Sequence, residues 1–213
     1  MTATRHFRRH AAAAVLIAAA GSLALTGCQA SGTTTEPTSQ GSTMSTSEFS
    51  TLDAAGVEQI RTSKAARLDM SSGRLEKTAV RVTDDSYGPE INTKDSGKIS
   101  LTIVGPSGEI SADTDRIRFN TTTKRQDFTE VTYFLTADSP EEYFDLIRDG
   151  VARYGIDSAS AERWISSTRE DPGTKSDFSI TSGRSTGLDV NYDLRYDGGK
   201  STQVIIVHVR PAA

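Results

Sequence analysis

The chain has 213 residues, a single cysteine and a formal net charge of −4 at pH 7. One cysteine cannot form an intrachain disulfide, so the fold must be held together by packing. The acidic balance offers no electrostatic attraction to nucleic acid or to anionic lipid headgroups. We therefore expect no nucleic-acid partner.

The N-terminal residues indicate export from the cytoplasm. Three of the first ten residues are arginine and none is acidic, and residues 11–25 (AAAAVLIAAAGSLAL) carry no charge. A basic start before a short apolar core is typical of a secretory signal peptide, and the core is too short for a stable membrane span. The pair Arg8-Arg9 also leaves a twin-arginine export route open.

The apolar run leads into the tetrapeptide LTGC at residues 25–28. This tetrapeptide resembles the lipobox of bacterial lipoproteins, and the resemblance covers residues 1–28 only. In that family the cysteine thiol receives a diacylglyceryl group and the signal is cut off before the cysteine. The new amine is often acylated as well, for example with palmitate. The resemblance implies that residues 1–27 are a lipoprotein signal peptide and that Cys28 is the lipidation site.

A lipidated Cys28 implies that the membrane is a partner, bound through the acyl chains. Each buried methylene contributes ~0.8 kcal/mol, so two or three chains anchor a protein firmly. We expect a lipid-anchored protein on the extracytoplasmic face of the cell membrane. In a cell with two membranes we expect the outer membrane, because Gln29 replaces the Asp that signals inner-membrane retention in this family. Loss of the three signal arginines leaves 21 basic against 28 acidic side chains, a net of −7.

The next residues predict a linker. After Cys28 the chain is rich in Ser, Thr and Gly as far as residue 47. Such a segment cannot bury enough apolar surface to offset its ordering entropy. A random coil of this length spans roughly 25 Å. We therefore expect residues 28–47 to be the lipidated cysteine and a flexible tether, and residues 48–213 to be a single globular domain.

The domain begins with a pattern that predicts a helix over residues 52–68. Its helical stripe is formed by Val57, Ile60, Lys64 and Leu68. The apolar period then changes to two. This alternation predicts four strands, at residues 74–82, 97–105, 115–123 and 127–137.

The strongest helical pattern covers residues 139–155 (SPEEYFDLIRDGVARYG). Ser139 is the expected N-cap, Pro140 takes the first helical position, and Gly155 supplies the left-handed stop. The expected apolar face consists of Tyr143, Phe144, Ile147, Val151 and Tyr154. A second helix is expected over residues 160–168, with Trp164 in the core.

The C-terminal part of the chain predicts further strands. Residues 177–182 form a short one, and residues 187–211 form a hairpin with a turn at Gly198-Gly199. The inward positions of its first strand are Leu188, Val190, Tyr192, Leu194 and Tyr196. We therefore predict an α+β fold, in which an antiparallel sheet of six or seven strands carries the helix pair of residues 139–170 on one face.

The inventory of reactive side chains argues against catalysis. His208 is the only histidine beyond residue 10, and no GxSxG turn presents a serine nucleophile. One histidine without a free cysteine cannot supply the ligands of a zinc site. Four loop aspartates are best explained as solvated turn residues: Asp84, Asp85, Asp113 and Asp115. We therefore predict no catalytic residues, no metal site and no cofactor.

These observations predict a membrane-anchored cell-envelope lipoprotein whose extracytoplasmic domain is a binding or interaction module, with an envelope protein or lipid as its partner. One alternative is a carrier that holds a lipid or another small hydrophobic ligand in an apolar cavity of roughly 300 Å³ or more. A second alternative is an enzyme with an unrecognised carboxylate-based site, for which converging carboxylates with raised pKa values would be the sign.

Overall fold

The computed structural model describes residues 48–83 and 86–213. The predicted signal peptide, the lipidation site Cys28 and the tether lie outside the described residues, as do Asp84 and Asp85. In chain order the elements are α1 (Ala54–Ser63), β1 (Ala65–Asp69), β2 (Leu75–Glu76), β3 (Glu90–Asn92), β4 (Ile99–Val104), β5 (Glu109–Thr114), β6 (Arg116–Asn120), β7 (Asp127–Phe128), β8 (Glu130–Ala137), α2 (Pro140–Tyr154), α3 (Ser158–Glu170), β9 (Lys175–Ser179), β10 (Leu188–Asp197) and β11 (Gln203–Pro211).

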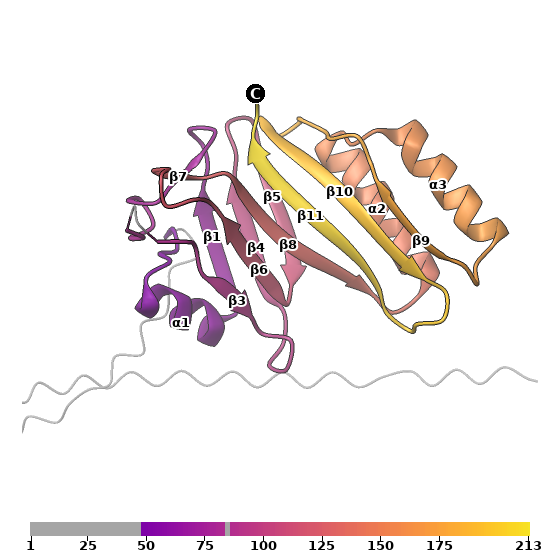
Figure 1. The fold of residues 1–213 in the computed structure, drawn as a ribbon, viewed down its shortest axis with the longest axis horizontal. Helices are drawn as coiled ribbons and strands as arrows, with labels where there is room; N and C mark the ends of the chain where they lie inside the picture. Colours follow the sequence, from indigo (N-terminus) through magenta and orange to yellow (C-terminus); the bar gives the residue numbers. More distant parts are fainter. Residues whose placement is uncertain (1–47, 84–85) are drawn as a thin grey trace, which may run out of the picture. The chain divides into compact units, whose positions relative to one another are not determined.

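The main sheet has six strands in the order β3-β6-β8-β11-β10-β9, and every neighbouring pair is antiparallel. Helix α2 contacts β8, β10 and β11, and α3 packs against α2. In Figure 1, α2 passes behind β10 and β9, so α2 and α3 are on one face of this sheet. The predicted α+β fold, with an antiparallel sheet and a helix pair on one face, is confirmed.

Two smaller sheets complete the domain. Strands β1, β4 and β5 form a three-stranded sheet in the order β1-β4-β5, in which β1 and β4 are parallel. Strands β2 and β7 form a short two-stranded sheet. Helix α1 contacts β1 and β3. The strands are therefore divided among three sheets.

Strand alternation places one face of the main sheet against the helices. The five predicted inward positions of β10 are all buried. Between this face and the helices, three aromatic rings pack together with centroids 5.8–6.2 Å apart. They are Tyr143 of α2, Trp164 of α3 and Tyr196 of β10. Aromatic contacts of this kind stabilise by ~0.5–1.5 kcal/mol each beyond burial, and they join the helix pair to the sheet.

Helix α2 has the predicted caps. The Ser139 side chain accepts the Glu142 N–H at 3.2 Å, and Gly155 ends the helix with φ at 72°. The predicted apolar face is rotated slightly, because Val151 is only half-buried whereas Gly150 is buried. A Cβ at Gly150 would lie 2.6 Å from Cε2 of Tyr192, so the tyrosine ring requires glycine at this position.

The first predicted helix is too long. Helix α1 ends at Ser63, and Lys64 adopts the left-handed conformation with φ at 56° while its N–H bonds to the Ile60 carbonyl. Residues Ala65–Asp69 form β1 and pair with β4. Sheet pairing therefore overrides a weak helical pattern in this segment.

The strand predicted at residues 74–82 is also wrong beyond its start. Only Leu75–Glu76 forms a strand, and the chain then turns, with Arg81 at φ 61°. Val80 and Val82 are nevertheless buried. Apolar alternation in this segment reflects a compact turn whose side chains reach the core, rather than a strand.

Other boundaries differ from the predictions. Strands β3 and β5 were not expected, because β3 is very short and Glu109–Thr114 (EISADT) has few apolar residues. Helix α3 begins at Ser158 behind an Asp157 cap, earlier than expected. The β10–β11 hairpin closes with a loop over residues 198–202, so Gly198-Gly199 is not a two-residue turn by itself.

The packing of α2 makes a prediction for stability. Phe144 is 2% exposed. Its truncation to alanine should lower the free energy of unfolding by about 3–5 kcal/mol, because it leaves a cavity between helix and sheet. Asp145→Ala is the matched control on the same helix, since the Asp145 side chain is 79% exposed. Urea denaturation of both variants checks this, and equal losses would mean that the buried face of α2 is misassigned.

Candidate functional site

The site originates at Thr114, where the chain passes from one sheet to another. Strands β5 and β6 are separated only by Asp115 but belong to different sheets. The Thr114 side chain is fully buried. Its hydroxyl lies 2.8 Å from the Phe134 carbonyl and 2.9 Å from the Arg116 carbonyl, and it accepts the N–H groups of both residues at 3.2 Å. Thr114 thus joins β5, β6 and β8 at one point.

Beyond this junction β5 and β8 diverge. The pairing of β6 with β8 ends at Ile117 and Tyr133. Strand β8 continues in the main sheet beside β11 as far as Ala137, whereas β5 turns away and pairs with β4. Helix α2 runs over the space between the two strands. The result is an open groove of about 500 Å³, bounded by β5, β8, α2 and the start of β4.

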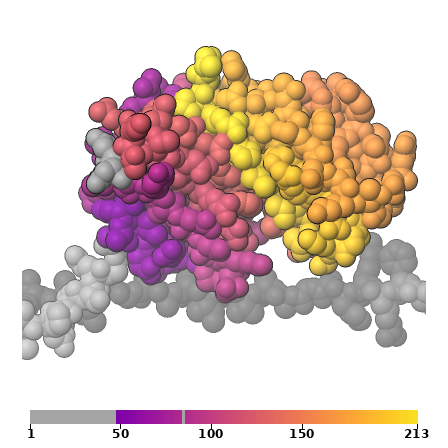
Figure 2. All heavy atoms as spheres, in the orientation of Figure 1, coloured from indigo at the N-terminus to yellow at the C-terminus, as the bar shows by residue number. Residues whose placement is uncertain are grey.

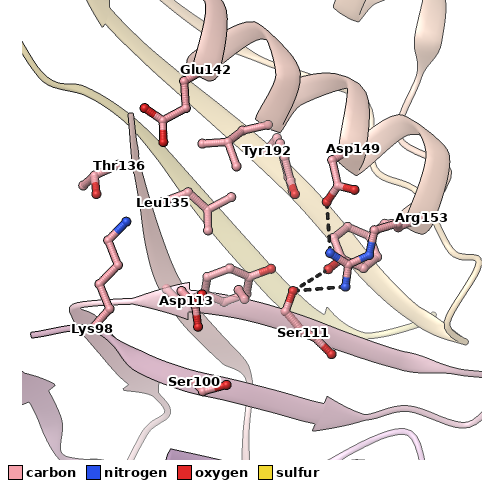
Figure 3. Close-up of a pocket in the computed structure, with 14 residues that line it drawn as sticks. Lys98, Ser100, Ser111, Asp113, Leu135, Thr136, Glu142, Asp149, Arg153 and Tyr192 are labelled. Carbon is pink, nitrogen blue, oxygen red and sulfur yellow. Dashed lines mark hydrogen bonds and ion pairs between the residues drawn. The ribbon is translucent and has the colours of Figure 1, made fainter. Parts of the chain in front are cut away.

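The floor of the groove is formed by buried side chains of the main sheet. Leu135 and Tyr133 come from β8, and Tyr192 comes from β10. Figure 3 shows Leu135 and Tyr192 between the α2 wall and the β5 wall. Leu146 of α2 adds a half-buried apolar side chain. The floor is therefore apolar apart from the tyrosine hydroxyls.

The tyrosines of this region differ in how their hydroxyls are satisfied. The Tyr154 hydroxyl donates to the Ser111 carbonyl at 3.1 Å. The Tyr133 hydroxyl is buried close to that of Tyr154, and no group among the described residues meets hydrogen-bond geometry with it. A buried hydroxyl without a partner is destabilising by roughly 1–3 kcal/mol. The Tyr133 hydroxyl thus lies beneath the floor of the groove, inside the fold and out of contact with the open space.

Burial also fixes the protonation of these groups. It raises the pKa of Tyr133 well above the ordinary range, and it raises the pKa of Tyr154 and Tyr192 in the same direction. The three hydroxyls are therefore neutral at physiological pH. In this neutral form each hydroxyl can both donate and accept a hydrogen bond.

The walls of the groove carry charges of both signs. Arg153 of α2 pairs with Asp149 at 3.0 Å and donates to the Ser111 carbonyl at 3.1 Å, as the dashed lines in Figure 3 show. Glu142 accepts the Asp138 N–H at 2.9 Å. Two of the carboxylates that line the groove therefore already have structural partners.

The opposite wall and the mouth come from the other sheet. Ser111 and Asp113 of β5 line the groove, together with Ser100 and the exposed Lys98 near the start of β4. In Figure 3 the Lys98 side chain points toward Thr136 across the opening. Lys98 therefore lies at one end of the open groove.

His208 lies on the face of the main sheet that the helices do not cover. Its register partner on β8 is Thr132, whereas Tyr133 points to the helix side. Nδ1 of His208 lies 3.0 Å from Oε1 of Glu130, and Arg210 Nη2 lies 2.6 Å from Oε2. Figure 2 shows this face, with β11 in yellow running across it. His208 lies in a polar cluster with Glu130 and Arg210 and does not line the groove.

The remaining sequence candidates are scattered. Of the aspartates predicted to lie in turns, Asp113 instead lies in strand β5, where it lines the groove, so that prediction is wrong for Asp113. The Asp115 carbonyl accepts the Thr93 N–H at 2.7 Å. Trp164 is buried in the aromatic cluster, as expected. Across residues 48–83 and 86–213, no three His, Cys, Asp or Glu side chains gather where they could hold a metal ion. In the same part of the chain, no helix is long and apolar enough to cross a membrane.

Sequence reasoning did not find the groove residues. Tyr133 and Tyr192 occupy ordinary inward positions of their strands, and β5 was not expected as a strand. The one local signal was Gly150, a glycine on the buried side of a well-capped helix, which indicates that another group approaches the helix closely.

Comparison of the chain with protein-family models, with curated proteins and with solved structures finds no match. Its function is therefore inferred from the geometry of the groove and from the features of the sequence.

The ion-pair cluster around Glu130 predicts a pH effect. Burial by itself raises the pKa of Glu130, but hydrogen bonds from His208 and Thr132 and the charge of Arg210 outweigh it and lower this pKa to about 2. Because the folded pKa lies below the ordinary 4.5, the stabilisation is present above about pH 4.5 and is lost as pH falls toward 2. Urea melts of wild type and Glu130→Gln should therefore differ most near neutral pH and converge in acid. A difference that is constant over this range would contradict the assignment.

Proposed function

We propose that the protein is a membrane-anchored cell-envelope lipoprotein whose domain of residues 48–213 acts by binding a partner in the groove between α2, β5 and β8. One observation carries this proposal. The groove of about 500 Å³ combines a largely apolar floor with charged side chains of both signs on its walls. A pocket of this size with a few converging polar groups is the usual form of a binding site.

Binding is favoured over catalysis by the state of the polar groups. The tyrosine hydroxyls remain neutral, and Glu142 and Asp149 are engaged by Asp138 and Arg153. The arrangement thus lacks a pair of free carboxylates placed for acid and base roles. We accordingly propose that the groove performs no hydrolysis and needs no cofactor.

A protein partner is favoured over a stored lipid by the lining of the groove. Its walls carry five charged side chains: Lys98, Asp113, Glu142, Asp149 and Arg153. Acyl chains laid against these groups would remove them from water without compensating hydrogen bonds, which is unfavourable. A polypeptide can satisfy such groups while its apolar side chains contact the floor.

The anchor is proposed from the LTGC tetrapeptide at residues 25–28. Cells that express the Cys28→Ser variant should contain a protein that takes up no alkyne-labelled fatty acid and is either uncleaved or released from the membrane. The wild-type protein expressed in parallel should be labelled. Equal labelling of the two proteins would reject Cys28 as the acylation site.

The groove itself can be tested in cells by photo-crosslinking. A benzophenone amino acid at Lys98 should capture a specific protein, because Lys98 stands at the mouth of the groove. Lys94 is the matched control, since it is an exposed lysine of the same loop that does not line the groove. Mass spectrometry of the captured material, with lipid extraction alongside, provides the readout. Capture of only lipid at Lys98, or the same proteins at both positions, would contradict the proposal.

A further inference from the structure

Strand β5 presents a free edge to the groove. The Ser111 carbonyl accepts hydrogen bonds from Arg153 and Tyr154 of α2, so it points away from β4 and into the groove. In an antiparallel pair the N–H and C=O of one residue point to the same side, and the side alternates along the strand. The main-chain groups of Glu109, Ser111 and Asp113 therefore face the free edge of β5, while those of the residues between them pair with β4. Of these three residues, Ser111 and Asp113 line the groove.

The described strands leave this side of β5 unpaired, since β5 is the outer strand of the order β1-β4-β5. The Ser111 carbonyl is already occupied by α2. The N–H of Ser111 and both main-chain groups of Asp113 are the ones directed at the open part of the groove. Edge groups of this kind form a template for pairing with another extended chain.

The groove also provides surfaces that the side chains of an added extended chain can contact. A strand added to β5 would lie ~4.8 Å from it, with its side chains pointing alternately to opposite faces. One row would face the floor formed by Tyr133, Leu135 and Leu146. The other row would face solvent, beside the charged side chains of the rim.

We infer that the groove binds an extended peptide segment of a partner protein, which adds to β5 as a short strand centred on Asp113. This inference rests on the proposed binding function of the groove and specifies the class of partner. Main-chain hydrogen bonds to β5 would provide affinity, and apolar residues at alternate positions would provide selectivity. A lipid or a compact small molecule could not use the row of alternating main-chain donors and acceptors.

The central variant is Asp113→Pro, because proline removes the N–H that a new strand requires and is tolerated on an edge strand where that N–H faces outward. Asp113→Ala is its matched control, since it removes the carboxylate but keeps the N–H. The probe is a phage-displayed library of random peptides long enough to span the six residues of β5. It is selected on the full-length protein in detergent.

Selection on the wild-type protein should enrich peptides that have apolar residues at alternate positions. The dissociation constants of these peptides should be at least about tenfold higher for Asp113→Pro than for Asp113→Ala, because both variants lack the carboxylate and only the proline lacks the N–H. Melting curves establish that both variants are folded. Failure to enrich any peptide above the level obtained with Asp113→Pro, or equal affinity for the two variants, would overturn the inference.

A second measurement remains informative if Asp113→Pro does not fold. Saturating the wild-type protein with a selected peptide should slow hydrogen exchange at the Ser111 and Asp113 amides, and unchanged exchange there would equally overturn strand addition.

The Lys98 crosslink separates the proposed binding function of the groove from the inferred strand addition to β5. If a protein is captured at Lys98 while these amides stay unprotected, the groove binds but not through β5. If nothing is captured at Lys98, the binding function itself is contradicted.

Discussion

The hydrogen bonds of Thr114 determine how the two main parts of the sheet structure meet. A single buried hydroxyl contacts the main chain of Phe134 and Arg116, and it does so where β5 passes into β6. Since neighbouring strands on either side of this point belong to different sheets, β5 and β8 must diverge beyond it. The groove and the free edge of β5 both follow from this divergence.

The other interactions of the groove limit how far it opens. Arg153 and Tyr154 reach from α2 to the Ser111 carbonyl and cover part of the β5 edge. Natural proteins protect edge strands with charged side chains and nearby elements, because a long open edge promotes aggregation. Only the part of β5 around Asp113 therefore remains available, which suits a short segment.

The sequence predicts the parts of the fold that depend on local rules. Ser139, Pro140 and Gly155 determine the limits of α2, and the alternation from Leu188 to Tyr196 identifies the inward face of β10. The segments that were mispredicted depend on distant partners. Ala65–Asp69 is a strand because β4 lies beside it, and β5 has too few apolar residues to be recognised alone. The groove could not be predicted, because it arises from the relative direction of two strands, which no local pattern encodes.

The central claim is that a polar group beneath the floor of the groove is left unpaired in the free protein. It is tested most directly by the free energies of unfolding of Tyr133→Phe and Tyr154→Phe, measured in urea without any ligand. Tyr154 donates to the Ser111 carbonyl, so Tyr154→Phe should lose about 1 kcal/mol. Tyr133→Phe removes an unsatisfied buried hydroxyl and should be as stable as wild type or more so. A loss for Tyr133→Phe as large as that for Tyr154→Phe would show that the Tyr133 hydroxyl is already paired within the fold and would contradict the account.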